Sequence, residues 1–546
     1  MSGCTWLRKN AAKFAVLSAG LYLLPFNGVY AREQQPLPFA GSGASASASA
    51  VDDPSSMVVV KEFRFMGSHV IAESELQQQL FPYINRSCNL NTLREAANVV
   101  TQLYQQRGLI FAKAYIQPQK IVDGVVVITV VEGRIGKVTI EGNRHYSTNF
   151  IHRYLTSGEG PLTIERFERG LLLLNSQFTD LSVTANFVPG QEPGTTDIAV
   201  KAVDHFPLQL TLSSNNYGSE YVSRERFGGQ IGWSNALISG SQATIGGFVG
   251  NKPKNMSIVN GGYVFPLNSV GTMVGVSALH GNSVVGKDFA DLGIENKETS
   301  GDMYLSHPLR VNRRSTLFGK VGFRAANTKY YYLFDQLSGY DKTRVVYAEL
   351  QGDMISYGGK SFANLSLSQG LGDMLGGTKT GDILASRQDA TNSFTKLNAG
   401  VARLQPLSDG FSSLFRLSGQ WSPSNLLAGE EWLIGGINSV HGYASGEAAG
   451  TEGYTASLSL RSTPLVNKEI LQLSLFLDYG YAHKKNALKG SKVNTSLTGV
   501  GFGVVSHIAD SVVPTDLRFD VGFPLNPTSN ALQQNPVFSF DVSVHF

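Results

Sequence analysis

The sequence predicts two small α+β units followed by a transmembrane antiparallel β-barrel of about 16 strands. Three observations predict it. Strand and helix signals occur twice between residues 58 and 206, and apolar and polar residues alternate from about residue 207 onward. The last nine residues alternate up to an aromatic terminus, Phe546. A period of two places successive side chains on opposite faces of a strand, so one face meets an apolar medium and the other meets water.

The first segment of the chain, residues 1–31, reads as a secretory signal peptide, with basic residues before an apolar core at Phe14–Leu24 and a small-residue cleavage site ending at Ala31. Residues 32–57 contain a run of Gly, Ser and Ala that predicts a low-complexity linker. The net charge of +3 and the 2 cysteines give neither the concentrated basic face that binds nucleic acid nor a disulfide framework. We therefore predict no nucleic-acid partner.

The next segments, residues 58–134 and 135–206, are predicted to be two copies of one βααββ unit, offset by about 75 residues. The first copy opens with a strand at Phe63–Gly67 and the second with a strand at Val138–Gly142. Apolar residues at helical spacing after Leu93 predict the second helix of the first copy. Each copy is predicted to form a small sheet with helices on one face.

The segment 207–546 is predicted to be the barrel, because charged residues share the polar face of its alternating strands. In Leu471–Tyr481, Leu and Tyr occupy one face, and Asp478 lies on the other. Burying such charges in the core of a soluble sandwich would be costly, whereas a water-filled lumen accommodates them. A soluble adhesin is therefore disfavoured. The other charged residues assigned to the lumen face are Arg416, Asp516, Arg518 and Asp520.

The final strand is predicted to close the barrel. We expect it to pair with the first barrel strand, near residues 208–214. Asp541 and His545 should then face the lumen, and Phe546 should face lipid. No His-Glu-x-x-His segment occurs, the histidines do not cluster at ligand spacing, and no nucleophile arrangement stands out. We therefore predict no metal, no cofactor and no enzymatic activity.

A series of short motifs runs through the chain in a fixed order. They are Leu103–Gly108, Pro118-Gln119, Asp123-Gly124, Val131–Ile135, Ser368–Leu371, Gly435-Gly436, Ser439–Tyr443, Phe476–Gly480, Asp516–Asp520 and Pro524-Leu525. In this order the chain resembles the two-partner secretion transporters, the TpsB (ShlB/FhaC/HecB) family of the Omp85 superfamily. The resemblance implies two periplasmic POTRA domains and a sixteen-stranded barrel in the bacterial outer membrane.

The resemblance also implies a function and its partners. The chain would recognise an unfolded TpsA-like exoprotein through its POTRA domains and secrete it through the barrel. Other partners would be outer-membrane lipid and, during biogenesis, the barrel assembly machinery, for which the terminal Phe546 would be the assembly signal. The client could bind as an added strand on a POTRA edge or beside the second helix. The candidate residues on that helix are Asn98, Thr101, Gln102 and Gln105.

Two motifs are implied to form the working site of the lumen. The inward-folded pore loop would carry Val440, His441, Gly442 and Tyr443, and its partner strand would carry Phe476, Asp478 and Gly480. Family members usually have Arg where this chain has His441. A guanidinium can hold a carboxylate through two parallel hydrogen bonds, whereas an imidazole makes one bond per nitrogen and is half neutral near pH 6.5. We therefore hypothesise a weaker, pH-sensitive lock. Alternatively, His441 only fills space and another lumen cation serves Asp478.

Other functions fit less well. An Omp85-type insertase that assembles other outer-membrane barrels is the alternative, but two POTRA units rather than a larger number favour secretion. A passive porin would have no use for these units. The client is not specified by the sequence: a haemolysin, an adhesin, a contact-dependent toxin and a haem-binding protein are all compatible.

The lock hypothesis predicts that channel opening in planar bilayers varies between about pH 5 and 8, because the charge of an imidazole changes in this range. His441→Arg should abolish this dependence, because a guanidinium stays charged. A flat profile for the natural chain together with an unchanged His441→Arg variant would refute the lock.

Overall fold

The structure is a computed structural model. It describes residues 57–107, 109, 112–132, 134–158, 162–191, 195–334, 336–462, 471–487, 491–508, 513–526 and 534–546. The predicted signal peptide at 1–31 and the predicted linker, except for its last residue, lie outside the described residues. The described chain divides into two compact units, one ending at His205 and one beginning at Phe206. Within the described residues, no helix has the length and apolar character needed to cross a membrane.

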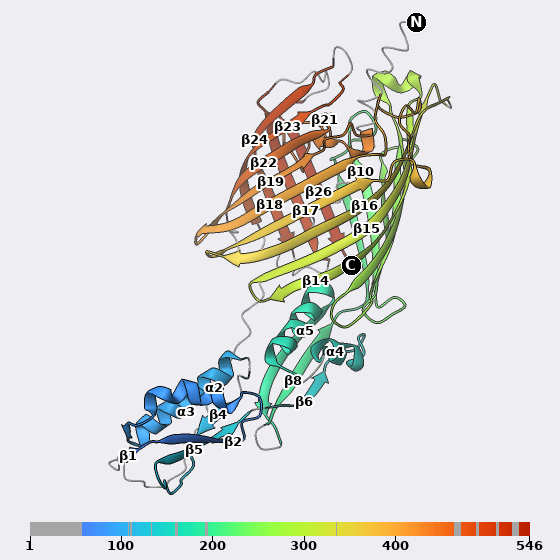
Figure 1. Cartoon of the computed structure of the whole chain (residues 1–546). Coiled ribbons are helices and arrows are strands. Elements are labelled where there is room, and N and C mark those ends of the chain that lie inside the picture. Colours follow the sequence, from blue (N-terminus) through green and yellow to red (C-terminus); the bar gives the residue numbers. More distant parts are fainter. Residues whose placement is uncertain are drawn as a thin grey trace. The chain divides into compact units, whose positions relative to one another are not determined.

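The first small domain has a three-stranded sheet in the order β2-β5-β4, with β2 and β5 parallel and β4 and β5 antiparallel. Figure 1 shows α2 and α3 beside this sheet. Its core includes Phe63, Leu76, Val100 and Ile128, all at most 1% exposed. The elements are β1 (Val58–Val59), β2 (Glu62–Met66), α2 (Glu73–Leu80), η1 (Phe81–Tyr83), β3 (Ser87–Cys88), α3 (Leu90–Gln106), β4 (Lys113–Tyr115) and β5 (Val125–Val131).

The second small domain repeats this arrangement, with the sheet order β6-β8-β7. Ser147 and Thr163 cap the two helices, each accepting a hydrogen bond from a backbone N–H of the first turn. The βααββ order predicted for both copies is therefore present in the structure. The elements are β6 (Arg134–Glu141), α4 (Thr148–Leu155), α5 (Ile164–Gln177), β7 (Leu181–Pro189) and β8 (Thr195–Asp204).

Both small domains use the same tight turn after their first long strand. Gly67 follows β2 with φ +83°, and Gly142 follows β6 with φ +90°. A Cβ at either position would lie 2.4 Å from the carbonyl oxygen of Val130 or Ala202, respectively. Glycine is required at both sites because a left-handed backbone coincides with a close approach to the neighbouring strand.

A carboxylate at the end of the sheet closes each of these turns. Glu132 accepts hydrogen bonds from the N–H groups of His69 and Val70, at 2.6 and 2.7 Å. Asp204 accepts from the three successive N–H groups of residues 144–146, at 2.6 to 3.1 Å. Burial alone would raise the pKa of the Asp204 carboxyl, but these hydrogen bonds outweigh it and hold the pKa below its usual value.

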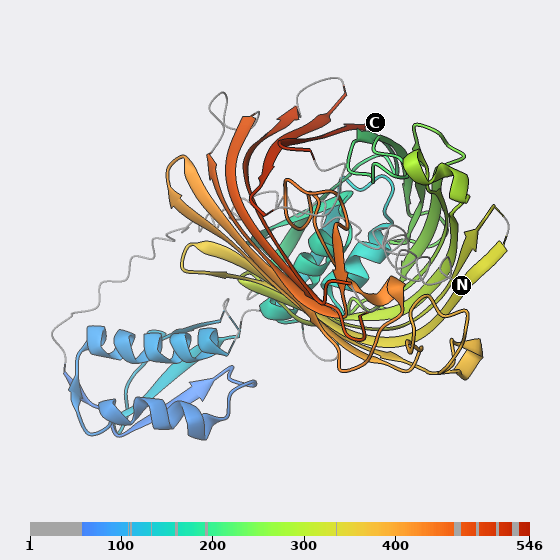
Figure 2. The same ribbon diagram turned by 90° about the horizontal axis from the view of Figure 1, so that it is seen from above.

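The barrel forms the second compact unit. Within the described residues, sixteen strands make one closed antiparallel ring, which Figure 2 shows from above. Each strand pairs with the next along the chain, except that β19 pairs with β22. The strands are β9 (Leu208–Asn215), β10 (Arg226–Ser234), β11 (Gln242–Gly250), β12 (Met256–Pro266), β13 (Met273–Val284), β14 (Glu295–Asn312), β15 (Ser315–Tyr332), β16 (Gln336–Ser356), β17 (Gly359–Gly370), β18 (Thr395–Ser408), β19 (Phe411–Trp421), β22 (Glu452–Ser462), β23 (Leu471–His483), β24 (Asn494–Ile508), β25 (Thr515–Pro524) and β26 (Val537–His545).

The two faces of the wall differ as the alternation predicted. On β23, Leu475 is 60% exposed on the outer face, whereas Asp478 is fully buried on the inner face. The outer face of β26 carries Phe538 and Phe540, both exposed, and Phe546 after it is 60% exposed. His545, on the opposite face, lies 3.0 Å from Asp516. An apolar exterior around a polar interior is what a membrane-spanning barrel requires.

The seam of the barrel confirms that the last strand pairs with the first. The register runs from Asp541 opposite Asn215 to His545 opposite Thr211. The backbone N–H and carbonyl groups of Phe546 then form hydrogen bonds with those of Leu210, at 2.8 and 3.1 Å. The C-terminal residue is thus part of the closure.

At the start of β26, side chains instead of strand β9 form hydrogen bonds with the backbone groups of the strand edge. The Asn216 side-chain amide donates to the carbonyl oxygen of Phe538 and accepts from the N–H of Phe540, at 2.9 and 2.8 Å. Arg224 donates a second hydrogen bond to the carbonyl oxygen of Phe538, at 3.0 Å. These side chains satisfy a strand edge that would otherwise be open.

We predict that Asp204→Asn in the full-length protein speeds hydrogen exchange at residues 144–146. A neutral amide accepts more weakly than a carboxylate, so the turn should lose about 1–3 kcal/mol. Because the pKa of Asp204 is lowered in the folded state, its stabilisation is fully present above the unfolded-state value of about 3.9 and is lost as the pH falls through the folded value. Asp197→Asn is the control, because it weakens the acceptor of a single N–H, that of Lys137. Equal exchange in both variants would contradict the prediction.

Candidate functional site

A long segment between β19 and β22 folds into the barrel. This inward loop, residues 422–451, is the orange ribbon inside the ring of strands in Figure 2. It contains a short 3₁₀ turn, η4 (Ala428–Glu430), and two short strands, β20 (Trp432–Ile434) and β21 (Ala448–Gly450), which pair antiparallel. The predicted pore-loop motif lies between these strands. Irregular backbone is tolerated at membrane depth where it is enclosed by protein.

The structure brings the predicted pair His441 and Asp478 together. Nδ1 of His441 lies 2.5 Å from Oδ2 of Asp478, and the backbone N–H of His441 donates to the same oxygen at 3.1 Å. The imidazole also stacks on the ring of Phe476, with centroids 4.1 Å apart. His441 is 5% exposed and Asp478 is fully buried. The three residues therefore form one compact contact between the loop and β23.

Glycines on three neighbouring strands lie directly against the inward loop. A Cβ at Gly499 on β24 would lie 2.0 Å from the carbonyl oxygen of His441, and one at Gly522 on β25 would lie 2.4 Å from the backbone nitrogen of Gly442. At Gly480 on β23, a Cβ would lie 2.8 Å from Cγ2 of Val440. We call Gly480, Gly499 and Gly522 the glycine floor. Because these three positions lack side chains, the loop backbone can approach β24 and β25, and the Val440 side chain can approach β23.

The other two motif residues attach the loop beside this floor. Val440 is fully buried and packs with Ile434, Ala482 and Leu497. The Tyr443 hydroxyl lies 2.9 Å from the carbonyl oxygen of Thr498 and accepts from the Asn526 N–H at 3.0 Å. All four predicted motif residues therefore contact the wall or lie directly on it.

Some contributors to this site escaped the sequence-based prediction. Gly499 and Gly522 were visible as glycines on the polar face of alternating strands, but nothing in the sequence linked them to the loop. Arg416 was assigned to the lumen, and the structure places it at a small pocket that His441 and Ser457 also line. Arg416 is thus a cation close to the His441–Asp478 contact.

The predicted client-binding residues all lie on α3, but they differ in exposure. Asn98, Gln102 and Gln105 are exposed, whereas Thr101 is half-buried. The Thr101 hydroxyl donates to the carbonyl oxygen of Ala97 and accepts from the N–H of Ala114 on β4, at 3.1 and 2.9 Å. Thr101 therefore ties the helix to the edge strand and has little left to offer a client.

The second small domain caps its edge strand in the same way. Asn175 on α5 accepts from the N–H of Val183 on β7 at 2.8 Å and donates to its carbonyl oxygen at 2.9 Å. An added strand would need those two backbone groups. The edges of β4 and β7 are thus each occupied at one residue by a side chain of the second helix.

No group of three or more His, Cys, Asp or Glu side chains that could hold a metal ion occurs among the residues that the structure describes. Cys88 is buried in the hydrophobic core of the first small domain.

Comparison with known proteins identifies the family of this chain. The model of the haemolysin secretion/activation proteins ShlB/FhaC/HecB matches residues 194–505, and the ShlB-type POTRA model matches residues 58–133. The heme/hemopexin transporter protein HuxB of Haemophilus influenzae is 24% identical, over 84% of this chain and 82% of that protein. The outer membrane transporter CdiB of Escherichia coli is also 24% identical, over 84% of this chain and 77% of that protein.

Solved structures show the same fold. CdiB from Escherichia coli matches with a TM-score of 0.76 at 19% identity, covering 99% of this chain and 98% of that one. CdiB from Acinetobacter baumannii has a TM-score of 0.70 at 16% identity, with 98% and 99% covered. BamA from Haemophilus ducreyi is more distant, with a TM-score of 0.51 at 15% identity, covering 89% of this chain and all of that one. The chain therefore belongs to the ShlB/FhaC/HecB family of haemolysin secretion/activation proteins, the outer-membrane transporters of two-partner secretion.

Proposed function

We propose that this transporter binds one unfolded TpsA-like exoprotein with its periplasmic domains and that the inward loop closes the lumen until this client enters. The observation that carries the proposal is the position of His441. The loop brings this residue into contact with Asp478 on the inner face of β23, so that the loop occupies the lumen side of the wall. A client would have to displace this contact to pass through the barrel.

The contact at the tip of the inward loop, residues 440–443, suits a reversible closure. His441 offers a single imidazole nitrogen to Asp478, where an arginine could form two parallel hydrogen bonds. The glycine floor adds close van der Waals contact but no charge. The residues of this tip carry no permanently charged side chain, and Arg416 remains close to the His441–Asp478 contact when the tip leaves.

Client recognition is proposed to rest on the exposed face of α3. Asn98, Gln102 and Gln105 present amide groups that can donate to and accept from an extended backbone. The edge of β4 is a poorer target, because Thr101 already bonds the N–H of Ala114. Peptide capture should therefore begin on the helix and extend along the sheet only where the edge is uncapped.

The exposed apolar residues of the barrel indicate its other partners. Its exposed outer residues, such as Leu475 and Phe540, suit lipid, and the C-terminal Phe546 is accessible at the seam. We propose that this terminal residue is the signal recognised by the barrel assembly machinery.

Secretion should depend on the chain and on the exposed face of α3. Deleting the gene should abolish release of the exoprotein encoded beside it, as measured in the medium. Replacing Asn98, Gln102 and Gln105 together by Lys should lower release about tenfold, because the amide acceptors are lost. The matched control replaces Gln77, Gln78 and Gln79 on α2, which are equally exposed. Undiminished release by the α3 variant would remove this surface from the proposal.

Gly499→Ala should open the channel in planar bilayers without client. The new methyl group would lie 2.0 Å from the carbonyl oxygen of His441, so the loop must move. Overpacking typically costs about 1–3 kcal/mol, which shifts the ratio of closed to open states by about fivefold to 150-fold. The control is Gly232→Ala, where a Cβ meets nothing within 4 Å. Similar conductance in both variants would argue against a loop seated on the glycine floor.

A further inference from the structure

Two adjacent carboxylates lie where the inward loop begins, far from its tip. Glu430 ends η4 and Glu431 follows it, and they are only 5% and 7% exposed. Buried carboxylates need compensating charges, because desolvation strongly disfavours an isolated ion. We call residues 426–431 the root of the inward loop. The function described above does not use these two charges.

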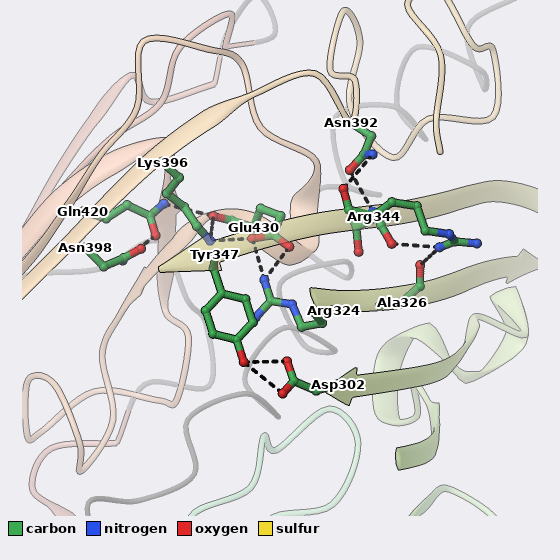
Figure 3. A network of polar contacts seen from close by, with 11 residues as sticks. Asp302, Arg324, Ala326, Arg344, Tyr347, Asn392, Lys396, Asn398, Gln420 and Glu430 are labelled. Atoms are coloured by element: carbon green, nitrogen blue, oxygen red, sulfur yellow. Dashed lines mark hydrogen bonds and ion pairs between the residues drawn. The ribbon is translucent and has the colours of Figure 1, made fainter. Parts of the chain in front are cut away.

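Glu430 binds the wall of the barrel. Its Oε2 lies 2.5 Å from Nζ of Lys396 on β18, and its two carboxylate oxygens lie 3.0 and 3.2 Å from Nη2 of Arg324 on β15. Its backbone carbonyl oxygen accepts from the side chain of Gln420 on β19, at 2.9 Å. Figure 3 shows Glu430 between Arg324 and Lys396. One residue of the loop thus contacts three strands of the wall.

Glu431 contacts the neighbouring loops. Its Oε1 lies 2.7 Å from Nη1 of Arg387, which belongs to the loop between β17 and β18, and its Oε2 lies 3.4 Å from Nζ of Lys484, which follows β23. Arg387 also donates to the carbonyl oxygens of Leu426, at 2.9 Å, and Lys485, at 2.7 Å. This guanidinium is 6% exposed and links the root to both adjoining loops.

The root and the tip are therefore held very differently. Among ionic contacts, the tip has one imidazole–carboxylate pair, whereas the root has two carboxylates that face four cations, on two wall strands and in two loops. Withdrawing the root would leave Lys396 and Arg387 buried without their carboxylate partners. Breaking a buried pair on one side is strongly destabilising, because it leaves an uncompensated charge. A small force should therefore release the tip well before the root.

We infer that Glu430 and Glu431 are positioning residues that anchor the root of the inward loop, so that residues 432–447 move about a stationary attachment during gating. This inference rests on the proposed closure of the lumen by the loop. The inference adds that residues 432–447 move and that the root stays in place. After the client has passed, the fixed root returns the tip to the glycine floor.

The test compares conductance in planar bilayers without client. Asp478→Asn releases the tip, and Glu430→Gln combined with Glu431→Gln releases the root. The tip variant should flicker between the natural closed level and one open level. The root variant should stay open, with its ratio of closed to open states lower than that of the tip variant by on the order of tenfold or more. Heat-modifiable electrophoresis confirms that each barrel is folded.

Two further variants separate anchoring from general stabilisation. Asp302→Asn alters a carboxylate of the same lumen network that contacts Tyr347 at 2.9 Å, and its conductance should remain natural. Exchanging the charges, Glu430→Lys with Lys396→Glu, should restore closure that Glu430→Lys alone abolishes. Because heat-modifiable electrophoresis shows whether the single and double variants are folded, loss and rescue of closure in folded barrels report the position of the root and not general stability.

The inference is overturned if folded Glu430→Gln/Glu431→Gln channels close as often as the natural protein, or if they behave as Asp478→Asn channels do. A different result would refute the underlying proposal: a natural channel that never closes without client would show that the loop is no plug. Secretion by the natural chain is measured separately, so the two failures are distinguishable.

Discussion

Closure of the sheet between β26 and β9 is the constraint on which the rest of the structure depends. No water in hydrocarbon satisfies an unpaired backbone group, so a sheet that crosses a membrane must join its own edges. Backbone pairing from Asp541 to Phe546 does this at one end of the seam, and Asn216 and Arg224 do it at the other. The closed ring separates a polar interior from lipid, and only that interior can hold the charged inward loop.

The two attachments of the inward loop follow from this interior. At the root, the charges of Glu430 and Glu431 are balanced by cations from strands and loops that are distant in sequence. At the tip, the attachment consists of close contact with the glycine floor, hydrogen bonds of His441 and Tyr443, and a single imidazole–carboxylate pair. The proposed gating needs one attachment that stays fixed and one that is released, and this distribution of charge fits both requirements.

The two periplasmic domains share two stabilising features: a carboxylate that holds a turn and a side chain that caps a strand edge. Glu132 and Asp204 hold the turn after the first long strand. Thr101 and Asn175 cap the strand edge beside the second helix. Capped edges resist unwanted pairing, which matters for domains that must meet unfolded chains without aggregating. We propose the exposed face of α3 as the surface that a client meets first.

The sequence by itself determined the architecture, because alternation and terminal signals are local. Period-two patterning was enough to place Asp478 in the lumen and Phe546 on the outer face. The family resemblance suggested a contact between His441 and Asp478 and left open a role for another cation; the structure contains the contact. Only the tertiary structure decided that Glu430 meets Arg324 and Lys396, and that Gly499 supports the loop. The physical reason is that these contacts depend on how strands are registered around a closed ring and on where an irregular loop meets them. Neither the register of the strands nor the position of the loop follows from a periodic pattern of residues along the chain.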